Sequence, residues 1–183
     1  MLGDSIAAGL FIERFEQSLG GLVATALAAE HGRPVRCLNL ARAGAATRDL
    51  LVQLPETPQA DVALVVIGAN DVARRTPLSR FETELDQTLT ELDDVGEVLL
   101  FGPCDISAVP LFPFWLRRFA AWQMGFYIAA MERVVARHAN VSYAWLPPSA
   151  GMPADLFAAD RFHPNADAHK IIADRLLSGR AAA

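Results

Sequence analysis

Residues 61–71 read Asp-Val-Ala-Leu-Val-Val-Ile-Gly-Ala-Asn-Asp, and this stretch decides the fold. Residues 62–68 form an almost unbroken apolar, β-branched run, which is typical of a strand buried on both faces. Strands of this kind belong to parallel sheets that helices cover on both sides. The polar residues that follow indicate that the chain leaves the sheet at Gly68.

Working outward, three more short apolar runs predict strands, at residues 35–41, 97–103 and 141–147. Apolar residues that recur at helical spacing, together with capping residues, predict helices at 11–31, 47–54, 78–93, 117–138 and 164–178. We expect Thr47 to cap the second of these helices and Pro164 to start the last one. Strands that alternate with helices indicate a layered α/β fold with right-handed crossovers.

The composition of the chain excludes several classes of protein. The chain has 183 residues, 52% of them hydrophobic and 20% charged, which suits a single folded domain over residues 1–183. The net charge of −5 argues against a nucleic-acid partner, because a phosphate backbone requires a basic surface. No apolar run reaches the length of a membrane span, and two cysteines do not make a disulfide framework.

Four polar motifs stand near the start of the chain, after predicted strands, or directly before the last predicted helix, and α/β proteins place their active sites at the carboxyl ends of the strands. They are, in chain order, Gly3-Asp4-Ser5, Gly44, Gly68-Ala69-Asn70-Asp71 and Asp160-Arg161-Phe162-His163. Each motif alone is ordinary turn chemistry, but their joint occurrence in this order is not. We interpret Asp4 and Asp71 as structural carboxylates that bond backbone groups in their turns.

The four motifs together resemble the blocks of the SGNH (GDSL-type) hydrolases. The resemblance spans essentially the whole chain and implies a three-layer α/β/α, flavodoxin-like parallel sheet. It also implies hydrolysis of carboxylic esters or thioesters through an acyl-enzyme, with a small-molecule ester as substrate and no cofactor. The oxyanion hole implied by the resemblance consists of the backbone N–H groups of Ser5 and Gly44 and the side-chain amide of Asn70.

The chemistry of the residues agrees with that implication. A serine hydroxyl needs a neighbouring base to become a nucleophile, and His163 is a candidate for that base. Asp160, three residues earlier, is placed to orient the imidazole and stabilise its protonated form. The expected catalytic residues are therefore Ser5, Asp160 and His163.

Residues 106–115 form an apolar, Pro-interrupted segment that we expect to be a loop at the active-site end. A substrate-binding role for Phe112, Phe114 and Trp115, as the wall or lid of an acyl pocket, is the preferred interpretation. Packing beneath the loop, and contact with a second copy or a membrane surface, are the alternatives. Oligomeric state stays open between monomer and homodimer.

Two rival functions remain. A metal-dependent hydrolase would use Asp160, His163, Asp167 and His169 as ligands, although Asp167 and His169 point different ways on a helix. A non-catalytic binding domain on the same fold is the second rival.

The start of the chain departs from the family pattern, because only Met1 and Leu2 precede Gly3 where the family has a full strand. We expect the first strand to be truncated here. No secretory signal is visible, which favours the cytoplasm, but the abrupt start leaves a secreted or periplasmic location open.

Overall fold

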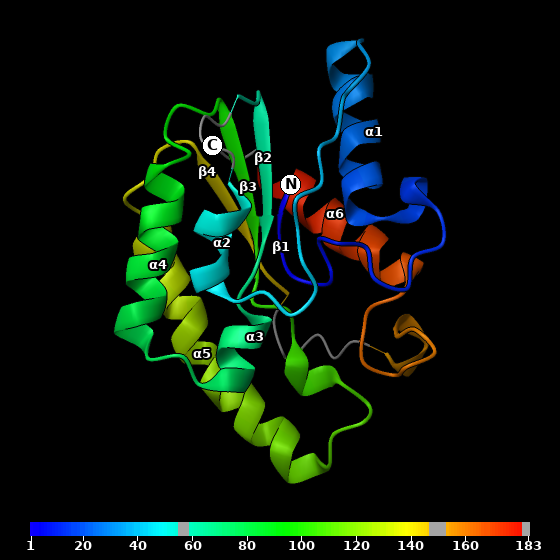
Figure 1. The fold of residues 1–183 in the computed structure, drawn as a ribbon. Helices are drawn as coiled ribbons and strands as arrows, with labels where there is room; N and C mark the ends of the chain where they lie inside the picture. The colour runs from blue at the N-terminus through cyan, green and yellow to red at the C-terminus, as the bar shows by residue number, and fades with distance from the viewer. Residues whose placement is uncertain (55–58, 147–152, 181–183) are drawn as a thin grey trace.

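The computed structural model describes residues 1–54, 59–146 and 153–180. These residues contain a parallel sheet in the order β1-β2-β3-β4, formed by β1 (Leu2–Gly3), β2 (Val62–Val66), β3 (Glu97–Phe101) and β4 (Val141–Ala144). Helices α1 (Leu19–His31) and α6 (Ala166–Arg180) lie on one side of the sheet (Figure 1). Helices α2 (Thr47–Gln53), α4 (Leu78–Thr90) and α5 (Phe114–Val135) lie on the other. The predicted three-layer α/β/α architecture is confirmed.

The sheet is buried on both faces because alternate strand residues enter two separate apolar cores. In β3, Val98 and Leu100 pack with α4 and α5, whereas Leu99 and Phe101 pack with α1 and α6. All four side chains are fully buried, as the near-continuous apolar run predicts. None of the helices in the described part of the chain is long and apolar enough to cross a membrane.

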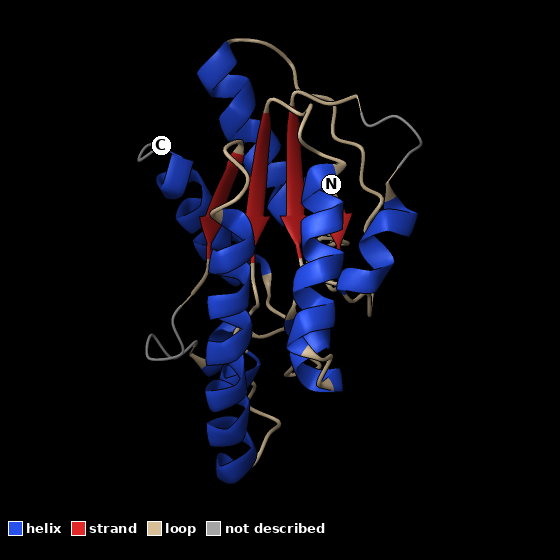
Figure 2. Ribbon diagram, turned by 90° about the vertical axis from the view of Figure 1, so that its left-hand side faces the viewer, coloured by secondary structure: helices blue, strands red, loops and turns tan. Residues whose placement is uncertain are grey.

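Parallel pairing brings the carboxyl ends of all the strands to one edge of the sheet (Figure 2). The segments that leave this edge include a short helix, α3 (Ala69–Arg74), which is not among the predicted helices. They also include 3-10 turns at Ile106–Ala108 and Ala154–Leu156. Residues far apart in the sequence therefore meet at this edge, as expected for an α/β sheet.

The predicted strand at residues 35–41 is wrong, since this segment is extended but is not part of the sheet. Its partner would be β1, which offers only Leu2 and Gly3 for pairing. The N–H groups of Leu40 and Arg42 still donate to the carbonyls of Met1 and Gly3 at 2.9 and 3.0 Å. A third bond, from the Met1 amino group to the Leu38 carbonyl at 2.7 Å, also holds the segment beside β1. The ladder is not completed, because the Gly3 N–H donates to the side chain of Gln53 and not to this segment.

Two helix starts also differ from the prediction, because other residues cap them. Ala46, not Thr47, precedes α2, and its N–H donates to Asp49. Asn165 begins α6 by accepting hydrogen bonds from the N–H groups of Asp167 and Ala168, so Pro164 lies outside the helix.

The remaining differences concern element bounds. α5 begins at Phe114 behind Pro113, so part of the predicted apolar loop is helical. The first helix is divided: a 3-10 turn at Phe15–Gln17 precedes α1, which begins at Leu19 behind its N-cap Ser18. The predicted end of the last strand, Pro147, lies outside the described residues.

Candidate active site

Ser5 stands just beyond the end of β1, in a turn that only glycine allows the chain to enter. Gly3 has a φ of 133°, and a Cβ there would lie 2.0 Å from the carbonyl oxygen of Val66. This close approach lets the N–H of Asp4 donate to that same oxygen at 3.1 Å. The side chain of Gln53 bonds the backbone of Gly3 twice: it accepts a hydrogen bond from the Gly3 N–H at 2.7 Å and donates one to the Gly3 carbonyl at 2.9 Å. These hydrogen bonds fix the backbone next to Ser5 against β2 and α2.

Asp4 is buried directly behind Ser5 and has a structural role. Its carboxylate accepts a hydrogen bond from the N–H of Ile6 at 2.9 Å, which closes the turn that carries Ser5. Burial raises the pKa of Asp4 from 3.8 to about 7, and the hydrogen bonds from the backbone only partly oppose this.

Ser5, His163 and Asp160 form a continuous hydrogen-bonded chain. Nε2 of His163 lies 3.1 Å from the Ser5 hydroxyl, and Nδ1 lies 2.5 Å from an Asp160 carboxylate oxygen. Because the Asp160 carboxylate accepts a hydrogen bond from the Nδ1–H of His163, Nε2 is left with its lone pair facing the serine. The sequence separation between Ser5 and His163 is 158 residues, so the fold alone brings these groups together.

Asp160 is held in its orienting position by the turn that it begins. Its other carboxylate oxygen accepts hydrogen bonds from the N–H groups of Phe162 and His163, both at 3.0 Å. Burial acts to raise the pKa of Asp160, but the hydrogen bonds from His163 and Phe162 outweigh it and lower the pKa. The lowered pKa keeps the Asp160 carboxylate ionised at neutral pH.

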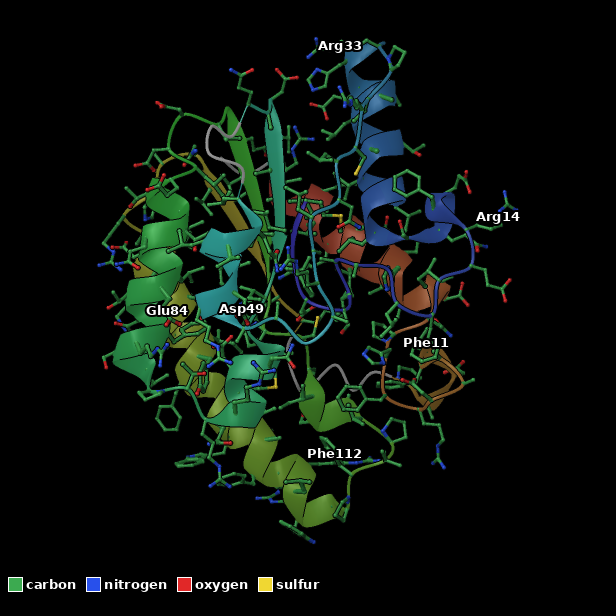
Figure 3. The ribbon with its side chains drawn as sticks, in the orientation of Figure 1. Phe11, Arg14, Arg33, Asp49, Glu84 and Phe112 are labelled. Carbon is green, nitrogen blue, oxygen red and sulfur yellow. The ribbon has the colours of Figure 1, made fainter. Side chains whose placement is uncertain are left out.

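Two aromatic rings enclose the imidazole of His163. Phe11 lies 5.3 Å from it and Phe162 lies 5.0 Å from it, measured between ring centroids. Phe162 also contacts Phe112 edge-on, at 6.1 Å. Phe11 comes from the loop after Ser5 and Phe112 from the segment before α5, at the same end of the molecule (Figure 3). Phe11 was not identified by the sequence analysis; its φ of 65°, unusual for phenylalanine, has no sequence signal.

Each of the three residues expected to form the oxyanion hole keeps an N–H group without a hydrogen-bond acceptor in the part of the chain that the structure describes. Within the described residues, the backbone N–H groups of Ser5 and Gly44 have no acceptor. One hydrogen of the Asn70 amide donates to the Ala45 carbonyl at 2.9 Å, which leaves the other available. That bond, with the one from Arg42 to Gly3, brings the Gly44 loop between Asn70 and β1.

Buried polar contacts fix the segment that carries Asn70. The carboxylate of Asp71 accepts hydrogen bonds from the N–H and hydroxyl of Thr47, at 3.0 and 2.8 Å. The Tyr127 hydroxyl donates toward the carbonyls of Asp71 and Thr76, at 3.2 and 2.6 Å. Burial raises the pKa of Asp71. The Asp71 carboxylate thus has the structural role that the sequence analysis expects, because its bonds to Thr47 join α2 to α3 next to Asn70.

A pocket of about 260 Å³ opens beside the Ser5 hydroxyl. Ser5, Asn70 and His163 stand among its polar lining residues. Its apolar wall is formed mainly by the 3-10 turn after β3 and by α5, through Ile106, Val109, Phe112, Leu116 and Phe119. Of the aromatic residues expected to bind substrate, Phe112 lines this pocket. Phe114 and Trp115 do not, and they are 75% and 69% exposed.

The sequence profile of the GDSL-like Lipase/Acylhydrolase family matches residues 1–171. The chain belongs to this family. Its relative GDSL-like esterase Rv1075c from Mycobacterium tuberculosis (strain ATCC 25618 / H37Rv) is 28% identical over 187 residues. The match covers 97% of this chain and 59% of the relative, so the chain spans well under two thirds of that protein's length.

Solved structures with low sequence identity share this GDSL-like fold. The lipase Lip_vut3 from a goat rumen metagenome has a TM-score of 0.80 at 14% identity, covering 97% of this chain and 94% of its own. The esterase EstA from Pseudoalteromonas sp. has a TM-score of 0.72 at 17% identity, with coverages of 99% and 94%. Axe2, an acetylxylan esterase from Geobacillus stearothermophilus, has a TM-score of 0.65 at 22% identity, with coverages of 97% and 91%.

The alternative metal site of the sequence analysis is not assembled in this family member. In the part of the chain that the structure covers, no three His, Cys, Asp or Glu side chains are grouped to hold a metal ion. His169 is buried in α6, and its Nδ1 accepts the N–H of Leu19 at 2.9 Å. Burial lowers the pKa of His169 to about 4. This histidine therefore serves the start of α1, whose first N–H groups lack partners within the helix.

Proposed function

We propose that the chain is a serine esterase that hydrolyses small-molecule carboxylic esters or thioesters through an acyl-enzyme. The observation that carries the proposal is the hydrogen-bonded chain from Ser5 through His163 to Asp160 at the mouth of an apolar pocket. Membership of the GDSL-like family supports it. The proposed catalytic residues are those three.

In the proposed acylation step, the Ser5 oxygen attacks the carbonyl carbon of the ester. Nε2 of His163 takes the hydroxyl proton, and the ionised Asp160 stabilises the imidazolium that results. The carbonyl oxygen becomes an oxyanion, which the N–H groups of Ser5, Gly44 and Asn70 would bind. Collapse of this intermediate breaks the bond to the leaving alcohol or thiol, which receives the proton from Nε2.

Deacylation repeats these steps with water as the nucleophile. Water gives its proton to Nε2 of His163, attacks the acyl carbon, and releases the acid as Ser5 regains its proton. The aromatic rings of Phe11 and Phe162 restrict the imidazole to the position in which it serves both steps. No cofactor takes part in this sequence of steps.

The acyl part of the substrate is the proposed occupant of the pocket. Its wall is apolar, and each methylene moved from water into such a wall contributes about 0.8 kcal/mol. A cavity of about 150 Å³ accommodates benzene. The 260 Å³ here would therefore admit an acyl group clearly larger than acetyl.

The test is hydrolysis of p-nitrophenyl esters and acyl-CoA thioesters of graded chain length. Ser5→Ala should lower kcat by at least about 10⁴-fold, because the Ser5 hydroxyl is the group that faces Nε2 of His163. Ser79→Ala, at an exposed serine of α4, is the matched control and should leave the rate unchanged. A reactive organophosphate should add its mass to the unaltered protein and not to Ser5→Ala. Hydrolysis by folded Ser5→Ala at the unaltered rate would refute the mechanism.

A further inference from the structure

Helix α5 carries an exposed aromatic stripe that the proposed chemistry does not use. Its members recur every three or four residues, so they share one face of the helix. They are Trp115, Phe119, Trp122 and Phe126, and we call them the α5 stripe. Three of the rings contact in succession, with centroids 5.9 Å apart for Phe119 and Trp122 and 5.0 Å apart for Trp122 and Phe126. A continuous apolar surface therefore runs along the helix.

This surface faces solvent and extends to Phe114, the first residue of the helix. Trp115 is 69% exposed, Trp122 63% and Phe126 45%, while Phe114, just before the stripe, is 75% exposed. The opposite face of α5 is buried in the core through Met124, Tyr127 and Met131. The exposed rings are therefore not displaced core residues, because the helix already has a separate buried face.

The α5 stripe adjoins the candidate active site. Phe119 belongs to the stripe and also lines the pocket beside Ser5, and Leu116 and Gln123 line it from the adjacent face of the helix. The N-terminal part of α5 extends past the carboxyl ends of the strands, beyond the rest of the molecule (Figure 1). A surface that touched the stripe would thus lie next to the pocket.

The charge around the stripe is opposite to that of the whole protein. The chain carries a net charge of −5, yet residues 106–131 contain no aspartate or glutamate and two arginines, Arg117 and Arg118. Arg118 lies over the ring of Phe114 at 5.8 Å, and Arg75 from the end of α3 lies over Phe119 at 5.4 Å. Aromatic side chains flanked by cations are the combination that binds the surface of an anionic bilayer.

The size of the patch favours a lipid surface over a second copy of the chain. A fully exposed aromatic side chain presents about 150–250 Å², so the exposed parts of Phe114, Trp115, Trp122 and Phe126 amount to on the order of 500 Å². A standard protein interface buries about 800 Å² on each partner. Insertion of a few aromatic rings into the headgroup region has no such minimum area.

We propose that the α5 stripe, with Phe114 and Arg118, docks the protein on the surface of an anionic lipid bilayer. Docking brings the mouth of the pocket against the lipid, so that an apolar ester reaches Ser5 without crossing bulk water. The binding step itself does not depend on the proposed esterase activity, and its test is arranged to keep the two apart.

The test is co-sedimentation of the 183-residue Ser5→Ala variant, which cannot turn over by the proposed mechanism, with lipid vesicles. One set contains phosphatidylcholine alone and the other phosphatidylcholine with phosphatidylglycerol. We expect stronger binding to the second set and a shift of tryptophan emission to shorter wavelength. Trp145→Phe removes a partly buried tryptophan outside the stripe and should leave that shift intact.

Variants at the surface identify the contact. Introducing Trp122→Ala and Phe126→Ala together into the Ser5→Ala protein should weaken vesicle binding about tenfold or more. Phe15→Ala, which removes a 52% exposed ring outside the stripe, is the control and should leave binding unchanged. Arg118→Gln should weaken binding about fivefold to the anionic vesicles only. Circular dichroism establishes that each variant is folded.

Three outcomes would overturn the proposal. The first is no binding to either kind of vesicle. The second is binding that is unchanged by the Trp122 and Phe126 substitutions. The third is a dimer in sedimentation velocity that these substitutions dissociate, which would assign the stripe to contact between copies.

Discussion

Replacement of Asp4 by asparagine should change how the free energy of unfolding depends on pH. Asp4 is 2% exposed, and burial raises its pKa to about 7 from the 3.8 of an exposed aspartate. Below about pH 4 the carboxyl is protonated in both the folded and the unfolded states. Between about pH 4 and pH 7 only the unfolded state releases the proton, so this group favours unfolding increasingly as the pH rises. Above about pH 7 both states are ionised and the effect is constant.

The size of the effect follows from the difference between the two pKa values. Each pKa unit corresponds to about 1.36 kcal/mol, so the change from 3.8 to about 7 gives roughly 4 kcal/mol. That is a large share of the roughly 5–15 kcal/mol by which a domain is stable. Asparagine has a similar shape, can accept the Ile6 N–H and does not ionise, so the variant loses this pH dependence.

The assay is urea unfolding, followed by circular dichroism across this pH range, for the unaltered chain and for Asp4→Asn. The free energy of unfolding of the variant, minus that of the unaltered chain, should rise by roughly 4 kcal/mol from pH 4 to pH 7 and then level off. Asp94→Asn, at an exposed aspartate after α4, is the control and should show a nearly constant difference. A constant difference for Asp4→Asn would show that the buried carboxyl is already ionised at pH 4, and the argument would fail.

Three further predictions concern other parts of the molecule. The pKa of His169 in the folded state is about 4, below the ordinary 6.5, so the unaltered chain loses roughly 3 kcal/mol of stability as the pH falls from about 6.5 to 4. His169→Asn should remove this loss, which runs in the opposite pH direction to that of Asp4. Urea unfolding at these pH values measures it, and an unchanged slope in the variant contradicts it. Asn70→Ala should lower kcat about 10²–10³-fold in steady-state assays with little change in KM, and a pure rise in KM would assign Asn70 to substrate binding instead. Phe112→Ala should reduce kcat/KM more for long acyl esters than for acetate, in the p-nitrophenyl series, and an equal loss at every chain length would indicate a structural role.

The sequence by itself determines the layered fold and the candidate site to a large extent. Near-continuous apolar runs at β2 and β3 indicate strands buried on both faces, and that pattern is local. Motifs placed directly after predicted strands meet at one edge of a parallel sheet, whatever the details of packing. Asn70 can therefore be placed at this edge before any coordinates are known, and the resemblance to the SGNH hydrolases assigns Ser5 and His163 to the same site.

The tertiary structure alone decides features that depend on a partner distant in the sequence. The apolar segment at residues 35–41 looks like a strand, but a strand also requires a neighbour, and β1 offers only two residues. The side chain of Gln53 bonds Gly3 from 50 residues away, and the Leu19 N–H finds its acceptor on His169, 150 residues along the chain. The outward position of Trp115 is likewise decided by helix α5 starting at Phe114, which turns the ring away from the pocket. Periodicity and turn chemistry report the preferences of neighbouring residues, whereas these pairings arise only when the packed core fixes the direction of each backbone and side chain.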